Sequence, residues 1–218
     1  MAIRKTTQKY YFSVEGETEK WYFDWLQEKI NKEPAAKHKV SIDSKIQNPI
    51  KRAKSINVLT KTEIIHVFDY ESNDEVHTVQ FIKTLDSLKD TSKLGKQIKY
   101  YPGYSNFTFE LWMVLHKAEC NAPLVHRRQY LEPINKAYGE KFENLDQYKH
   151  EANFKRVLGK ISLPEVIAAI NRSKVIVQKN MENGLVLQQY KGYQYYRENP
   201  ALSVWESIEK ILKYCELL

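Results

Sequence analysis

The pattern that most constrains the fold is an alternation of short apolar runs with stretches of helical periodicity through about the first 116 residues. Chains that alternate in this way form α/β domains, in which helices cover both faces of a mostly parallel sheet. The run 64–68, within "TEIIHVFDYES", is nearly continuous in apolar residues, as expected of a buried parallel strand. The predicted strands cover 8–14, 39–46, 64–68 and 96–101, and the predicted helices cover 19–31, 74–90 and segments that begin at Pro49 and near Asn106.

The second half of the chain carries mainly helical patterns. Helices are predicted within 127–139, 148–160, 163–184 and 201–218. Gly139, Gly159 and Gly184 stand where helix C-caps are expected, and Pro164 and Pro200 stand near helix starts. No segment has the composition of an independent linker. We therefore predict an α/β core over 1–116 and a helical part over 117–218 that packs on it.

The composition is that of a soluble globular protein with a moderate basic surplus. Lys and Arg number 34 against 27 Asp and Glu, which gives a net charge of +7. This surplus is compatible with a polyanionic partner, although many ordinary proteins are as basic. The N-terminus lacks the apolar segment of a signal peptide, and no window approaches the roughly 18 apolar residues of a membrane span. Cys120 and Cys215 make no disulfide framework, so we predict two reduced thiols in a cytoplasmic protein without membrane contact.

Acidic residues follow two of the predicted strands. Glu15 stands at the end of the first strand, and Asp69 and Glu71 stand at the end of the third. Ligands of open α/β sheets bind at the carboxyl ends of strands, where these side chains should meet. Asp69 and Glu71 are two residues apart, so an extended backbone would point both the same way. Convergent carboxylates stay ionised at low cost when a cation neutralises them, and oxygen ligands suit Mg²⁺, Mn²⁺ or Ca²⁺. On spacing alone, solvated or salt-bridged carboxylates remain the alternative.

Several blocks of the chain resemble a known family. The blocks "VEGETE" and "VFDYES" resemble the glutamate loop and the DxD strand of TOPRIM domains. With "SNFTFELWMVLH" over 105–116 and "ENPALSVWESIEKIL" over 198–212, nearly the whole chain resembles the RloB family of small bacterial TOPRIM proteins, which is related to the OLD-type nucleases. The resemblance implies a TOPRIM-like, Rossmann-like fold.

The resemblance also implies roles for individual residues. It makes Glu15, Asp69 and Glu71 the catalytic and metal-binding set, with Mg²⁺ or Mn²⁺ as cofactor. Glu110 would bind a second cation or orient a water. Glu71 is a departure, because aspartate is usual at its position and glutamate is one methylene longer. Phe107 is another departure, because proline is common there.

Two further acidic side chains have open roles. Glu19 lies one turn into the first predicted helix, where an anionic side chain favours the helix N-terminus. The alternative is that it supports the metal ligands from behind. Asp74, or Glu75, could replace the second acidic ligand through a water if Glu71 does not serve. Glu17 is expected to face solvent.

A basic, tyrosine-rich stretch forms a candidate nucleic-acid surface. Residues 149–197 hold nine Lys or Arg against three acidic side chains. The alternative is a set of helices with solvated basic faces. The candidate phosphate contacts are Arg127, Arg128, Lys155, Arg156, Arg172 and Lys174. His66 and His116 are expected to be structural, and Trp112 and Trp205 to lie in the core.

The function that the resemblance implies is divalent-metal-dependent cleavage of phosphodiester bonds in DNA or RNA, including tRNA. It also implies a role in bacterial phage defence beside a partner ATPase, and it leaves a homo-oligomer open. The alternative is a catalytically silent TOPRIM module that binds nucleic acid or a partner protein, and a nucleotide-binding sensor is a third hypothesis. The chain has no Gly-rich phosphate loop of its own.

Overall fold

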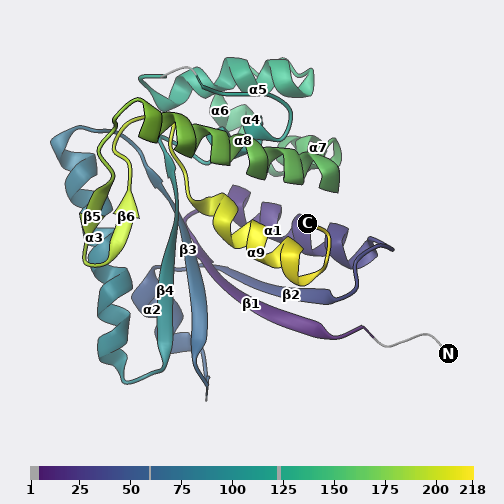
Figure 1. The fold of residues 1–218 in the computed structure, drawn as a ribbon. Coiled ribbons are helices and arrows are strands. Elements are labelled where there is room, and N and C mark those ends of the chain that lie inside the picture. Colours follow the sequence, from purple (N-terminus) through teal and green to yellow (C-terminus); the bar gives the residue numbers. More distant parts are fainter. Residues whose placement is uncertain (1–4, 59, 122–123) are drawn as a thin grey trace.

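The computed structural model describes residues 5–58, 60–121 and 124–218, and a four-stranded sheet forms its centre (Figure 1). All three strand pairings are parallel, in the order β2-β1-β3-β4. This confirms the predicted α/β class with a parallel, Rossmann-like sheet. The strands are β1 (Thr7–Val14), β2 (Lys39–Ile46), β3 (Thr62–Tyr70) and β4 (Ile98–Asn106).

Helices cover both faces of the sheet because apolar side chains alternate along the strands. Ile65 and Val67 of β3 pack in a cluster with α1 (Glu17–Lys32) and α9 (Val204–Tyr214). Ile64 and Phe68 face the other way. They pack in a second cluster with α2 (Pro49–Ser55) and α3 (Glu75–Asp90). A 3-10 turn, η1 (Thr91–Leu94), connects α3 to β4.

The chain reverses its direction of travel across the sheet between β1 and β3. It first crosses from β1 through α1 to β2 at one edge. It then returns through α2 to β3, which pairs with the other side of β1. The carboxyl ends of two such neighbouring strands form a topological switch point, where open α/β sheets bind their ligands. The fold therefore places the expected ligand site at the ends of β1 and β3. Glu15 follows the end of β1, and Asp69 lies at the end of β3.

The β1–β3 pairing is short. It spans four residue pairs, from Tyr11↔Ile64 to Val14↔Val67, whereas β1 and β2 pair over eight. The two strands therefore diverge toward their amino-terminal ends. A cavity of about 1040 Å³ opens there, with Tyr10, Glu63 and Lys210 among its lining residues. It lies at the other end of the strands from the acidic strand ends.

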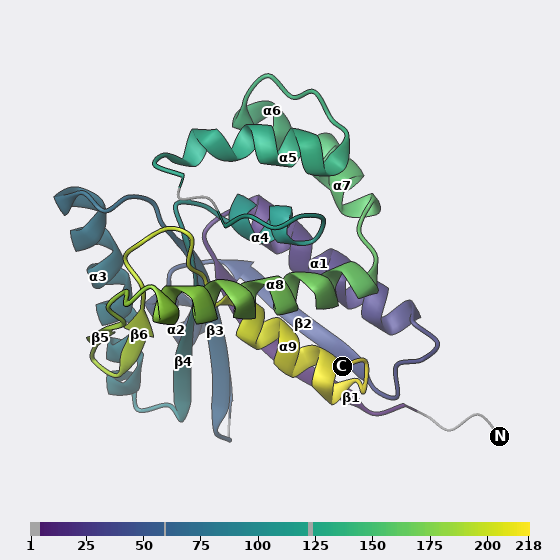
Figure 2. The same cartoon turned by 45° about the horizontal axis from the view of Figure 1, so that its top comes forward.

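Most helices of the second half lie beyond the upper end of the sheet in Figure 1, whereas α9 lies along one face of the sheet. Helix α8 packs against α4 and α9, as the second view also shows (Figure 2). One buried cluster contains residues from both sides of the predicted boundary at residue 116, from Phe12 to Cys215. The elements are α4 (Glu110–Leu115), η2 (Arg127–Tyr130), α5 (Leu131–Tyr138), α6 (Leu145–Lys149), α7 (Glu151–Gly159) and α8 (Leu163–Glu182).

A β-hairpin in the second half was missed by the sequence analysis. It consists of β5 (Gln188–Tyr190) and β6 (Tyr193–Tyr195), joined through Lys191 and Gly192 at positive φ. Tyr195 lies against Phe81 of α3, with the ring centroids 4.8 Å apart. The interleaved tyrosines of this stretch therefore bury against α3 and β4. A nucleic-acid surface is one interpretation of "YKGYQYYRE"; core packing accounts for Tyr195 and Tyr196.

Other boundaries differ from the sequence predictions for local reasons. The fourth strand runs on to Asn106, so the next helix begins four residues later than predicted, at Glu110. Gly139 and Gly184 adopt positive φ at helix ends, as predicted, but Gly159 is the last helical residue of α7. Pro164 lies in the first turn of α8 and Pro200 lies shortly before α9, so both stand near helix starts as predicted.

Several residue-level expectations are confirmed. Trp112 and His66 are buried. Cys120 and Cys215 are buried free thiols. None of the helices in the described residues has both the length and the apolar character that crossing a membrane requires.

Candidate functional site

The first acidic pair lies at the switch point. Glu15 follows β1 directly, and Asp69 is the penultimate residue of β3. The backbone N–H of Asp69 donates to Oε2 of Glu15 over 3.3 Å. The two residues that sequence reasoning placed at one edge of the sheet are therefore in contact.

Glu110 joins them from a third element. It is the first residue of α4 and is fully buried. Thr108 donates its hydroxyl to Oε2, whereas Oε1 is buried without a hydrogen-bond partner in the described structure. The turn before it holds Phe107 at φ 63°, a conformation that bulky residues rarely adopt and that proline cannot adopt. Backbone strain of this kind gathers at functional sites.

Glu19 also belongs to this cluster. Its side chain is 6% exposed, although it lies in the first turn of α1, and the hydroxyl of Thr18 donates to Oε2 over 3.1 Å. The carboxylate folds back over Gly16, where a Cβ would lie 2.8 Å from Oε2. Glu19 is therefore buried beside the other acidic residues while it keeps its place in the first turn of α1.

One cation of the chain lies among these carboxylates. Lys149, the last residue of α6, places Nζ 3.3 Å from Oε2 of Glu110. Burial lowers the pKa of Lys149, but the charges of Glu110, Asp69 and Glu19 outweigh it and leave the pKa raised. The ammonium therefore stays protonated beside three carboxylates, those of Glu110, Asp69 and Glu19. Together with Glu15, which contacts Asp69, they form what we name the carboxylate cluster: Glu15, Glu19, Asp69 and Glu110.

The electrostatics show an excess of negative charge. Burial, followed by the charges of Glu19 and Glu110, raises the pKa of Asp69 well above its ordinary value. Glu15 lies on the solvent-facing side of the cluster. Even so, loss of hydration beside the protein, and then the charges of Glu19 and Glu71, raise the pKa of Glu15 from 4.5 to about 7. Burial also raises the pKa of Glu19. Carboxylates in this situation are stabilised by protons or by a cation.

Glu71 points into a neighbouring pocket. Arg127 donates to Oε2 of Glu71 over 3.0 Å, and Nε2 of His77 lies 3.8 Å from the same oxygen. The pocket has a volume of about 10 Å³, and its lining includes Glu15, Asp69, Glu71 and His77. Asp69 and Glu71 therefore line the same pocket. Asp69 also belongs to the carboxylate cluster, whereas Glu71 is paired with Arg127.

Asp74 is the N-cap of α3 and holds His77. Its Oδ1 accepts the backbone N–H of His77 over 2.9 Å, and its Oδ2 lies 2.6 Å from Nδ1 of the ring. These hydrogen bonds lower the pKa of Asp74 to about 2, so it is ionised at neutral pH. Asp74 is thus hydrogen-bonded to His77 at the start of α3, beside the pocket that Glu71 lines.

The residues present fit a divalent cation in chemistry. Carboxylate oxygens are the ligands that Mg²⁺ and Mn²⁺ take, and Oε1 of Glu110 is an unpartnered acceptor. In the described residues, however, no three His, Cys, Asp or Glu side chains stand in positions from which they could hold one metal ion. Binding a cation would therefore need rotation of side chains such as Glu15, which is exposed.

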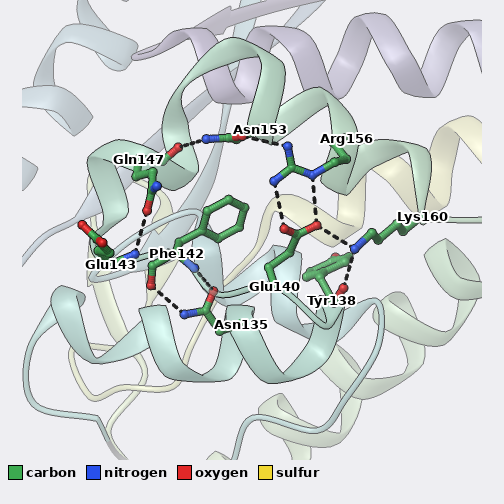
Figure 3. A network of polar contacts seen from close by, with 9 residues as sticks. All are labelled: Asn135, Tyr138, Glu140, Phe142, Glu143, Gln147, Asn153, Arg156 and Lys160. Atoms are coloured by element: carbon green, nitrogen blue, oxygen red, sulfur yellow. Dashed lines mark hydrogen bonds and ion pairs between the residues drawn. The ribbon is translucent and has the colours of Figure 1, made fainter.

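Most of the basic residues predicted to contact phosphates are paired with groups of the protein itself. Arg156 and Lys160 clamp Glu140 (Figure 3), with Nη2 of Arg156 2.9 Å from Oε2. Arg172 donates to the carbonyl oxygens of Leu115 and His116 at the end of α4. Lys155 pairs with Glu151, and Lys174 with Glu209.

Two basic residues lie near the acidic site. Arg127 of η2 pairs with Glu71, and the next residue, Arg128, is exposed and makes no ion pair with the described residues. The part of the predicted nucleic-acid surface nearest the site is therefore η2.

Sequence reasoning missed Lys149 and His77. Lys149 follows Glu110 by 39 residues, and nothing local distinguishes it from other basic residues. His77 carries a local signal, because a carboxylate three residues before a histidine at a helix start can reach the ring.

The comparisons with known proteins identify a family. A family model described as RloB-like protein matches residues 10–211. Neither a curated protein nor a solved structure shows significant similarity to the chain. The match spans nearly all of the sequence and includes the ends of β1 and β3 and the block over 105–116. The chain belongs to the family of RloB-like proteins.

Proposed function

We propose that this chain is a divalent-metal-dependent nuclease of the TOPRIM type that cleaves phosphodiester bonds in DNA or RNA. Glu15, Asp69 and Glu71 would hold Mg²⁺ or Mn²⁺ at the ends of β1 and β3, Glu110 would bind a second cation or orient a water, and Glu19 would support them from behind. A bound cation supplies Lewis-acid polarisation of the phosphate. A role in phage defence, in the cytoplasm and beside a partner ATPase, is part of the proposal and rests on the resemblance to the family.

The observation that carries the proposal is the carboxylate cluster itself. Four carboxylates, from the ends of β1 and β3 and the first turns of α1 and α4, converge near the topological switch point, and Lys149 is the cation that the described structure places beside them. Oε1 of Glu110 is buried and unpartnered in the described structure, which costs free energy that a bound cation would recover. A solvated acidic turn would not bury Glu110 or Glu19.

The chain's own residues would bind and orient the substrate. Arg127 pairs with Glu71 on the exposed side of the site, and Arg128 follows it in η2 and is exposed; guanidinium groups there can hold phosphate oxygens. Lys149 places a positive charge beside the acidic cluster, where an approaching phosphate is otherwise repelled. Burial of Glu110 keeps water from competing for its carboxylate.

The same ammonium favours the second candidate function. Lys149 already neutralises part of the cluster, and Arg127 holds Glu71, so the site is partly satisfied without a metal. A catalytically silent module that binds nucleic acid or a partner protein is the alternative that this arrangement supports.

The test compares cation binding and cleavage in matched variants. Purified protein is incubated with DNA and with RNA in Mg²⁺, Mn²⁺ or EDTA, and cation binding is measured by calorimetry. Glu15→Gln and Asp69→Asn should each weaken binding and cleavage at least about 100-fold, because each removes a ligand. Glu17→Gln, an exposed neighbour, is the matched control and should change neither.

The possible results distinguish the nuclease from the silent module. Cleavage that persists in both ligand variants would contradict the site. Undiminished cation binding in both variants would do the same. Nucleic-acid binding without cleavage or cation binding in the wild type would establish the silent module instead.

A further inference from the structure

The imidazole of His77 is fixed in one orientation and one tautomer. Asp74 contacts both the backbone N–H and Nδ1 of His77, at 2.9 and 2.6 Å. A carboxylate can only accept a hydrogen bond, so Nδ1 carries the proton in the neutral ring. The lone pair is then on Nε2. A histidine oriented by a carboxylate through its other nitrogen is the usual arrangement of a metal ligand.

Nε2 of His77 faces the small pocket beside the carboxylate cluster. It lies 3.8 Å from Oε2 of Glu71, and Glu15 and Asp69 line the same pocket. The volume, about 10 Å³, is about that needed for one water-sized particle. Two donors that share an ion at bond lengths of about 2.1 Å lie at most about 4.2 Å apart. The separation of His77 and Glu71 falls within that limit.

We propose that Nε2 of His77 is a ligand of the cation bound by Glu15, Asp69 and Glu71, and that Asp74 positions it. The inference rests on the proposed function and adds the identity of the cation. Mg²⁺ takes oxygen ligands almost exclusively, whereas imidazole nitrogen is a good ligand for first-row transition metals. The site therefore selects a transition-metal dication such as Mn²⁺ over Mg²⁺.

The proposal also gives a reason for glutamate at position 71. Glu71 contacts Arg127 on one side and approaches His77 on the other. Its extra methylene lets the carboxylate reach toward His77 in the first turn of α3. The ligand set is thus spread between the ends of β1 and β3 and the first turn of α3.

The test is Mn²⁺ electron spin echo modulation, with binding constants for Mn²⁺ and Mg²⁺ measured alongside. Wild-type protein loaded with Mn²⁺ should show ¹⁴N modulation from a coordinated imidazole. His77→Gln should abolish that modulation and weaken Mn²⁺ binding about 10-fold or more, while Mg²⁺ binding changes much less. Asp74→Asn keeps a capping side chain but loses the carboxylate, and should weaken Mn²⁺ binding about 10-fold. His38→Gln, on the loop before β2, is the matched control.

The outcomes separate this inference from the proposed function. Mn²⁺ that binds the wild type without ¹⁴N modulation would overturn the role of His77 and leave the carboxylate site intact. Modulation that persists in His77→Gln would overturn it as well. Failure of the wild type to bind either cation would contradict both proposals. The spectrum of the wild type tests the inference even if a variant fails to fold. Circular dichroism verifies that each variant is folded.

Discussion

At the scale of single residues, Gly16 decides where the Glu19 carboxylate can lie. Its φ of −134° is open to any residue, so the requirement for glycine is one of space. A Cβ at this position would lie 2.8 Å from Oε2 of Glu19. The glycine between Glu15 and Glu17 thus lets a helix-start carboxylate fold inward and join a buried site.

Gly16→Ala should therefore displace Glu19 and weaken Mn²⁺ binding. We expect a loss of about 0.5–1 kcal/mol in the free energy of unfolding, because alanine is a poorer N-cap than glycine and the displaced atom is the end of a flexible side chain. Urea unfolding and calorimetry measure the two effects. The matched substitution is Gly159→Ala at the end of α7, where a Cβ meets no atom within 4 Å. It should be neutral or stabilise by up to about 1 kcal/mol. Equal effects of the two substitutions would refute the steric argument.

At the scale of elements, the pairing of β1 with β3, here called the joint, brings the ends of the two strands and their acidic residues together. The two strands pair over four residues, and one of those pairs is Ser13 with His66. Their side chains are buried and hydrogen-bonded over 2.8 Å. Burial lowers the pKa of His66 from 6.5 to about 4, so the folded protein keeps the ring neutral. The joint is consequently sensitive to acid.

The sign of this pH dependence follows from proton uptake. Above pH 6.5 His66 is neutral in both states and contributes nothing. Below it the unfolded chain takes up a proton that the folded chain refuses, so stability falls until about pH 4. Between pH 7 and 5 this amounts to about 2 kcal/mol. The raised pKa of Glu15 acts in the opposite direction over part of this range, and a variant separates the two.

Between pH 7 and 5, the free energy of unfolding of His66→Gln should fall by about 2 kcal/mol less than that of the wild type. Urea unfolding at each pH measures both. Contributions from Glu15 and from His116, whose pKa is also lowered to about 4 by burial, are common to both proteins and cancel. Identical pH profiles for the two proteins would show that His66 does not account for the acid sensitivity.

At the scale of the whole molecule, α6 connects the two halves of the chain through charge. Lys149 comes from the helical part, and the carboxylates it faces come from the α/β core and α4. The ammonium and a divalent cation compensate the same negative charge. Folding of the second half onto the first therefore stabilises the acidic site before any metal binds.

Lys149→Met retains the aliphatic stem and removes the charge. We expect the metal-free variant to lose about 2 kcal/mol of stability, less than for a fully buried pair because Lys149 is 37% exposed. Saturating Mn²⁺ should restore more stability to the variant than it adds to the wild type, since binding stabilises by mass action. Thermal unfolding with and without Mn²⁺ measures both. A variant that Mn²⁺ stabilises no more than the wild type would exclude this competition.

The sequence by itself determined the α/β class and most element positions, because apolar periodicity is local. β2 was predicted with its observed limits, and Glu15 and Asp69 were placed at one edge because parallel strands end together. The missed hairpin and the early start predicted for α4 depend on packing against α3 and on the length of β4.

The tertiary structure alone decided which distant charges meet. Lys149 reaches Glu110 across 39 residues, and no local pattern records that approach. Arg156 and Arg172 had the same sequence signature as Arg127, but their partners Glu140 and the end of α4 hold them elsewhere. Periodicity along a chain specifies which face a side chain takes, whereas a charge's partner depends on three-dimensional distance, which the fold sets.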